Sequence, residues 1–415
     1  MKTNRVFILV VLLIAAVGFT AGTEGITLLA DSSMPAGPVL GQPGSLLEVY
    51  GVIDAALRIA TNANPIDNTN FGFSQGLING SRFGIRGTEG LGASFKAIYD
   101  LEGGVIVPVG QLDQQGQIFG RQAWVGVSSD YGKLTFGRQY GTFSDAIGAG
   151  DVFGVNHGNQ SYWSSSNTTG GANNYASNDA VNAFFLQESG LRWDNSIKYD
   201  ANFGGVTVGA QAMLSGIPNG TNIGNYSENT MYAVSIGYNS KNFPVAATVG
   251  YQLETDVNYL THQDVGGGIK YAFDPTDGVY AFYFHSQFEG GAPGFTRINP
   301  NDSELSSGTS LGRIDDIFNV AVNYYVTPSL NLIASYYLDY AQNIVVSWDT
   351  GTRNSFLLVA DYYFTKNFDV YLAGSDTMFS GNLENTSNGG DEFSNNTGHT
   401  VSNVFSAMLG MRFRF

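Results

Sequence analysis

The chain has 415 residues, a formal charge of −16, no cysteine, and 13% each of charged and aromatic residues. Charged residues are about half as frequent as in soluble domains, and the several runs of about 20 apolar residues that a helical membrane protein needs are missing. The acidic balance also argues against a nucleic-acid partner, because nucleic acids attract basic surfaces. This composition favours one large β domain that needs no disulfides.

The chain begins with the pattern of an export signal. Lys2 and Arg5 precede the apolar run "VFILVVLLIAAVGF" at 6–19, and small residues follow it. We predict a secretory signal peptide over residues 1–22. The alternative is an uncleaved anchor, but 14 apolar residues are few for a spanning helix. Removal of this segment would take the formal charge from −16 to about −18.

Residues 23–45 show no periodicity and predict a loose leader to a single domain over 46–415. That domain repeats one pattern, in which about ten residues alternate between apolar and polar before a turn or loop. Successive side chains of a strand point to opposite faces, so each repeat predicts one strand with an apolar face and a polar face. We predict about sixteen such strands, at 48–60, 80–88, 92–102, 119–128, 133–140, 191–199, 206–213, 231–239, 243–254, 263–273, 279–288, 315–325, 330–341, 355–364, 368–378 and 404–415.

The connections between these strands also alternate. Short turns such as "DPTDG" and "TKN" alternate with long polar loops, the longest at about 141–190. This asymmetry is typical of an outer-membrane barrel. A soluble sandwich would not show it, and a β-propeller would need a four-strand repeat of fixed period, which is missing. The sequence therefore predicts an all-β fold, a transmembrane antiparallel barrel.

Motifs for catalysis or metal binding are weak. The four histidines lack metal-ligand spacing, and no "GxSxG" occurs. The stretch "GVSSDYGKL" (126–134) has five residues between its glycines where a phosphate loop has four, and Leu134 stands where Ser or Thr is required. We interpret it as a turn between two strands. The sequence therefore predicts no catalytic site, no cofactor and no metal.

The chain ends inside a predicted strand, "FSAMLGMRFRF". A closed barrel must pair its last strand with its first, because open edges would leave unsatisfied backbone groups in lipid. Arg412 and Arg414 are expected to face the wet interior. The apolar residues expected to face lipid are Phe405, Leu409, Met411, Phe413 and Phe415.

Four stretches resemble the Gram-negative general porins, in particular their proteobacterial branch: "YGVIDAA" (50–56), "SRFGIRGTEGLGASFKAIYDLEGG" (81–104), "FGRQAWVGVSSDYGKLTFGRQYGTFSDAIG" (119–148) and "RWDNSIKY" (192–199). The resemblance implies a homotrimer of 16-stranded barrels in the outer membrane, in contact with lipid and lipopolysaccharide. Turns are then periplasmic, loops external, and the third loop folds into the pore. It also implies an assembly signal at Phe415, with Phe413 before it, read by the barrel-assembly machinery.

The resemblance further implies a pore constriction, in which wall arginines face acids of the third loop. Matching motifs place it at Arg82, Arg121, Arg192, Asp145 and Asp151. The alternative for each arginine is a solvated strand residue. Strand alternation agrees with an inward Arg82, whereas an inward Arg121 would turn Trp124 outward and Val125 inward. A further acid that the family often has after Asp151 is missing here, since Gly-Val-Asn-His occupies 154–157.

The expected function is a water-filled channel for passive diffusion of small hydrophilic solutes and ions. One alternative is a substrate-specific channel for a sugar or an anion, with Tyr283 and Tyr337 on predicted inward faces. Another is an adhesin that uses the Asn- and Ser-rich stretches 159–178 and 382–399. An outer-membrane hydrolase is a third, because Ser, His and Asp could meet in space without a sequence motif.

Overall fold

The computed structural model describes residues 45–61, 69–153, 192–214, 230–240, 242–255, 260–288, 312–343, 349–381 and 402–415. The predicted signal peptide lies outside these ranges, and so does the predicted leader except for its last residue. Both Asn- and Ser-rich stretches also lie outside them.

The described residues form eighteen strands. In chain order they are β1 (Leu46–Ala60), β2 (Asn70–Gln75), β3 (Arg82–Gly92), β4 (Phe95–Ile106), β5 (Gln111–Leu112), β6 (Gln122–Ser129), β7 (Gly132–Tyr140), β8 (Arg192–Phe203), β9 (Val206–Met213), β10 (Thr230–Tyr238), β11 (Val245–Thr255), β12 (Thr261–Ala272), β13 (Gly278–Phe288), β14 (Ile314–Thr327), β15 (Leu330–Gln342), β16 (Thr350–Tyr363), β17 (Phe368–Gly381) and β18 (Asn403–Arg414).

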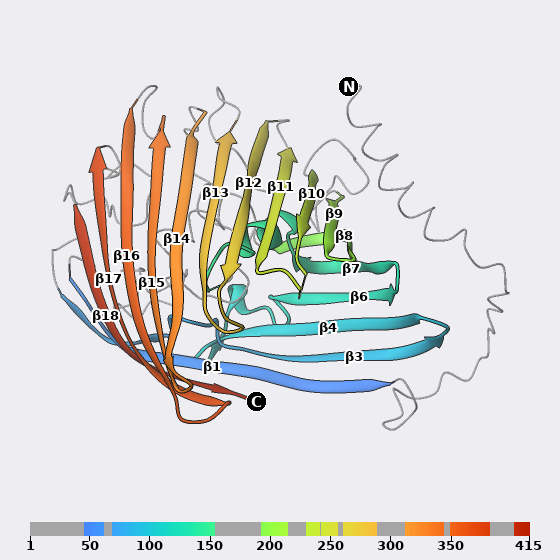
Figure 1. Ribbon diagram of the computed structural model, residues 1–415, viewed down its shortest axis with the longest axis horizontal. Coiled ribbons are helices and arrows are strands. Elements are labelled where there is room, and N and C mark those ends of the chain that lie inside the picture. The colour runs from blue at the N-terminus through green and yellow to red at the C-terminus, as the bar shows by residue number, and fades with distance from the viewer. Residues whose placement is uncertain are drawn as a thin grey trace.

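These strands form one closed antiparallel barrel. Strand β1 pairs with β18 along one edge and with β3 and then β2 along the other. Because β2 and β3 share one edge of β1, they are two halves of one barrel strand, and the two-residue β5 pairs with the end of β4. When β2 and β3 are counted as one strand and β5 is left out, the eighteen strands give the sixteen predicted barrel strands. Each predicted segment coincides with a strand to within a few residues. Figure 1 shows β10 to β18 as successive neighbours, with the C-terminus beside β1.

The barrel is polar inside and apolar outside, as a membrane barrel requires. In β18 the Leu409 and Met411 side chains are more than half exposed, whereas Arg412 is 3% exposed and pairs with Asp361 and Asp369 on the interior. The same alternation holds in β1, where Asp54 is fully buried. The predicted assignment of faces is therefore confirmed for the last strand, and the first strand shows the same alternation.

The last residue takes part in barrel closure. The backbone N–H of Gly51 donates to Phe415 O at 3.0 Å, and that of Phe415 donates to Gly51 O at 3.1 Å. The Phe415 ring lies directly over Gly51, where an added Cβ would stand 2.3 Å from a ring carbon. The absence of a side chain at position 51 therefore makes room for the terminal aromatic.

Two helices lie in the described residues, η1 (Gln114–Gly116) and α2 (Thr142–Gly148), and neither is long and apolar enough to cross a membrane. Helix α2 begins the third loop and lies inside the barrel, against β9 to β13 (Figure 1). Its Phe143 and Ile147 side chains are buried in an apolar cluster with wall residues such as Phe284. Gly268 on β12 lets the loop approach closely, because a Cβ there would lie 2.3 Å from the backbone nitrogen of Gly150. The described part of the third loop, residues 141–153, therefore folds into the pore, as expected.

Candidate pore constriction

The three arginines expected at the constriction meet around one carboxylate and one phenol. Arg121 Nε lies 2.8 Å from Glu102 Oε1, and Arg82 Nε lies 3.4 Å from Glu102 Oε2. Arg121 and Arg192 both donate to the Tyr140 hydroxyl, at 2.8 and 3.3 Å. The Arg192 guanidinium also lies 4.8 Å from the centroid of the Tyr140 ring. We call Arg82, Arg121, Arg192, Glu102 and Tyr140 the arginine cluster.

Arg121 reaches the interior because it precedes its strand. Strand β6 begins at Gln122, and the Arg121 backbone N–H donates to Glu102 O at 3.0 Å. Within the strand, Val125 is 59% exposed on the outer face. Trp124 lies on the same inner face as Gln122, and its indole N–H donates to the Gln122 side-chain oxygen. The expectation that an inward Arg121 would turn Trp124 outward and Val125 inward is therefore wrong, because alternation starts only after Arg121.

A bulge between β7 and β8 brings Tyr140 and Arg192 together. The register shifts after Gly137, which has φ +131°, and Asn195 on the facing strand has φ +47°. Bulges re-aim side chains in this way and are frequent near functional sites. Beyond the bulge Tyr140 pairs directly with Arg192, and Trp193 turns into the apolar cluster under α2.

The two acids of the third loop have different partners. Asp145 on α2 forms an ion pair with Lys198, whose ammonium also donates to Tyr140 O at 3.1 Å. Asp145 is thus connected to the arginine cluster through Lys198. Asp151 instead accepts from the Tyr337 hydroxyl at 3.4 Å and from the backbone N–H of Phe153 at 3.1 Å. Neither partner of Asp151 belongs to the arginine cluster.

Asp151 is 3% exposed. Burial raises the pKa of its carboxyl to about 6, although the hydrogen bonds from Phe153 and Tyr337 act in the opposite direction. Near pH 6 this carboxyl is therefore neutral part of the time, which lowers the cost of burying it without a cation. Asp151 therefore attaches the third loop to the barrel wall and is not a solvated charge in the pore.

Glu102 and Tyr140 were not among the residues selected from the sequence as constriction residues, and neither was Lys198. Glu102 lies on the inward face of β4, next to Arg82's strand, and it takes part in two of the ion pairs of the cluster. Strand alternation could have indicated that Glu102 faces inward. Its contact with Arg121 depends on where β6 begins, which the sequence does not define.

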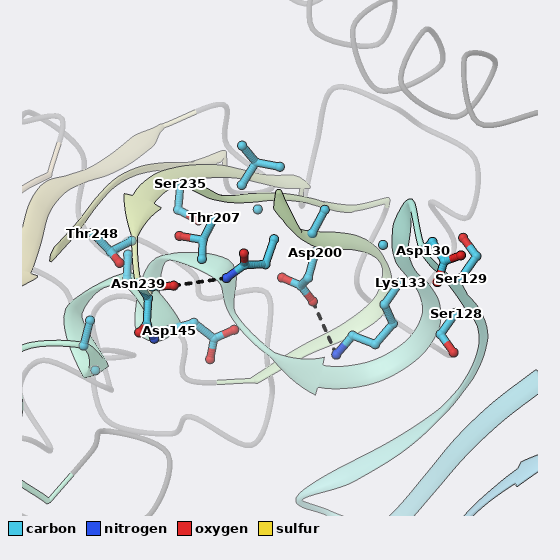
Figure 2. Close-up of a pocket in the computed structure, with 18 residues that line it drawn as sticks. Ser128, Ser129, Asp130, Lys133, Asp145, Asp200, Thr207, Ser235, Asn239 and Thr248 are labelled. Atoms are coloured by element: carbon cyan, nitrogen blue, oxygen red, sulfur yellow. Dashed lines mark hydrogen bonds and ion pairs between the residues drawn. The ribbon is translucent and has the colours of Figure 1, made fainter. Parts of the chain in front are cut away.

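Next to α2 lies a cavity of about 710 Å³. It is bounded by the helix and by residues at three of the short turns, including Asp130, Asn202 and Asn239. Figure 2 shows the Lys133 and Asp200 side chains pointing toward one another across 3.5 Å. This cavity lies between the start of the third loop and the short-turn end of the barrel.

The two tyrosines considered for a sugar path do not form one. Tyr283 faces outward, 39% exposed, and its hydroxyl donates to Asp316 at 2.7 Å, so its predicted inward orientation is wrong. Its neighbours Phe282 and Phe284 are the buried ones, and a run of aromatics gives no alternation from which to choose a face. Tyr337 does face inward, but it is buried beneath the third loop. Within the described ranges, no three His, Asp or Glu side chains are arranged to hold a metal ion.

Comparison with known proteins agrees with this architecture. A sequence profile described as Gram-negative porin matches residues 16–382. An outer membrane porin protein of Bordetella pertussis is 27% identical over 383 residues, covering 84% of this chain and 93% of that protein. An anion-selective porin from Comamonas acidovorans has a similar fold, with a TM-score of 0.64 at 19% identity, covering 89% of this chain and all of that one. The trimer form of OmpT from Vibrio cholerae gives 0.57 at 14% identity, over 90% of this chain.

The family match covers most of the chain, and the closed barrel with an inward third loop and a polar interior is consistent with it. The chain therefore belongs to the Gram-negative porin family and forms an outer-membrane barrel with a water-filled channel for the passive diffusion of small hydrophilic solutes and ions.

Proposed function

We propose that this channel is non-specific, that the arginine cluster forms the wall of its narrowest part, and that it prefers anions weakly at high salt. The observation that carries the proposal is the convergence of three arginines: Arg82 and Arg121 meet at the carboxylate of Glu102, and Arg121 and Arg192 meet at the hydroxyl of Tyr140. Three guanidinium groups against one carboxylate leave a formal excess of two positive charges on this wall. Side-chain charges at a constriction set ion preference in channels.

The net charge of the chain acts in the opposite direction. The mature chain would carry about −18, and much of this charge falls in the external loops. Such a field gathers cations at the mouth, but it is screened beyond about 8–10 Å at physiological salt. The constriction then dominates at high salt, and cation preference grows as the salt concentration is lowered. The alternative of a specific anion channel would show saturation with its solute.

Solute sizing tests the general channel. Purified protein in liposomes is expected to release small neutral sugars, and to release smaller sugars faster than larger ones. Rates that are independent of size, or no release, would contradict a diffusion pore, and no conductance in planar bilayers would favour the adhesin.

We also infer that the protein is not an enzyme and uses no cofactor. Turnover of model esters or peptides by the purified barrel would contradict this inference.

We further propose that the functional unit is a homotrimer in contact with lipopolysaccharide. The support is the resemblance to trimeric general porins, together with the likeness to a porin solved in a trimer form. The mass of the detergent-extracted protein, measured by light scattering, is expected to be three times that of the chain after subtraction of detergent. A mass of one chain would contradict the trimer.

Deletion of Phe415 is expected to lower the amount of protein in the outer membrane and to leave the conductance of assembled channels unchanged. One interfacial aromatic contributes only about 1.5–3 kcal/mol by burial, whereas the resemblance implies that the assembly machinery reads this end, with Phe413 as part of the signal. Quantification of barrels in outer-membrane fractions measures the effect. Phe364→Ala is the matched control, since Phe364 is an exposed aromatic in the turn after β16. Equal assembly of the deletion variant and the control would refute the signal.

A further inference from the structure

Residues 76–81, "GLINGS", leave the barrel wall and fold inward between β2 and β3. We call this segment the inward strap. Its Leu77 and Ile78 side chains are buried in an apolar cluster with inward residues of β15 to β18, among them Leu357 and Met408. The interior of a porin barrel has a mainly polar lining, and here apolar wall residues gather where the inward strap packs, as they do under α2.

Two buried side chains hold the inward strap. The Asp54 carboxylate accepts hydrogen bonds from the backbone N–H groups of Ile78 at 3.1 Å and Asn79 at 2.8 Å. The Tyr371 hydroxyl donates to Asp54 at 2.8 Å and accepts from the backbone N–H of Leu77 at 2.7 Å. Asp54 and Tyr371 are at most 1% exposed, so no solute in the pore can touch them. We call this pair the latch.

The inward strap crosses the seam where the barrel closes. Asp54 lies on β1 and Tyr371 on β17, and between them Arg412 on β18 donates to the Asn79 side chain at 2.6 Å. Ser81 at the end of the strap receives the backbone N–H of Asp54 on its hydroxyl at 2.9 Å. The strap is therefore attached to three consecutive barrel strands.

The inward strap also meets both sides of the proposed constriction. Arg82 of the arginine cluster follows Ser81 directly in the chain, and the Ser81 carbonyl accepts from the Val105 N–H of β4 at 2.9 Å. Phe153 of the third loop belongs to the same apolar cluster as Leu77 and Ile78, and Val152 packs against that cluster. The start of the loop is held by α2, and this contact holds a point further along it.

We propose that the inward strap, fixed by the latch, positions the pore constriction. It would hold Arg82 at the arginine cluster on one side and the Val152–Phe153 segment of the third loop on the other. This inference rests on the proposed function of the arginine cluster. It assigns to Asp54 and Tyr371 a positioning role in ion selectivity, although neither side chain lines the ion path.

Tyr371→Phe is the sharpest test, because it removes both latch hydrogen bonds of the hydroxyl without changing any charge. The native chain has no cysteine, so Ile78→Cys adds a unique reporter of strap docking that thiol reagents modify slowly while it stays buried. With Tyr371→Phe added, this cysteine is expected to react faster.

Tyr371→Phe channels without the reporter are expected to show noisier open currents. Their reversal potential in a salt gradient is expected to move toward cations, because Arg82 is held less firmly. Asp54→Asn, which weakens the hydrogen bonds to Ile78 and Asn79, should also speed the labelling of the cysteine.

Tyr336→Phe is the matched control, since it removes a hydroxyl that donates to Asn354 at 2.7 Å on the outer face of the barrel. It should change neither the labelling nor the currents. Faster labelling with unchanged currents would overturn the proposal, because the strap would then move without affecting the constriction. Unchanged labelling would overturn it as well, because the latch would not hold the strap. A wild-type barrel without conductance would instead contradict the proposed channel, and the labelling rates would still report on the latch.

Discussion

Arg121→Asp is expected to move the reversal potential measured at high salt toward cations, and Arg121→Gln is expected to move it less. The arginine cluster carries three guanidinium groups and the Glu102 carboxylate, a formal charge of +2. The Gln variant lowers this charge to +1 and the Asp variant lowers it to zero. At high salt only charges within a few ångströms of a passing ion act strongly, because distant charges are screened. The two variants should therefore give a graded shift.

Arg86→Asp provides the control for Arg121→Asp. Arg86 lies on the inner face of β3 and forms a bidentate ion pair with Glu48, with hydrogen bonds of 2.8 and 2.9 Å, but this pair is exposed and outside the arginine cluster. The same change in charge at that site should shift the potential at low salt and much less at high salt. If Arg121→Asp leaves the high-salt potential where it was, Arg121 does not line the constriction.

Gly268→Val is expected to lower the single-channel conductance strongly and to exclude the larger sugars of the sizing series. A Cβ at this position would lie 2.3 Å from the Gly150 nitrogen and 2.6 Å from the Ile147 carbonyl oxygen. Non-bonded heavy atoms need about 3.5 Å, so the backbone of the third loop would have to move by about 1 Å or more. The wall lies behind the loop, and the loop can therefore move only toward the lumen.

Gly374→Val controls for the change in strand propensity. Gly374 is also within a strand, β17, but an added Cβ there has no atom within 4 Å in its way. This variant should assemble and conduct like the wild type. An unchanged conductance in Gly268→Val would show that the loop does not depend on this contact. A raised conductance would mean that the loop leaves the wall altogether, and would contradict inward displacement.

The sequence determined the barrel itself. Side chains of a strand alternate between two faces whatever the strand's neighbours are, so sixteen alternating segments defined the strands, the face of Arg412 and the lipid-facing position of Met411. The pairing of the last strand with the first could also be predicted, because an open strand edge in lipid would leave unsatisfied backbone groups. The three arginines were selected by resemblance to a family, and the fold does bring them together.

Only the tertiary structure decided which side chains those arginines meet. Arg121 escapes alternation because it precedes the first paired residue of its strand, and the bulge at Gly137 aligns Tyr140 with Arg192. The inward strap joins Leu77 to Tyr371, which lies 294 residues further along the chain. Such contacts depend on where pairing starts, on single-residue register shifts and on closure of the barrel. These are properties of several strands together, and the alternation within any one strand does not encode them.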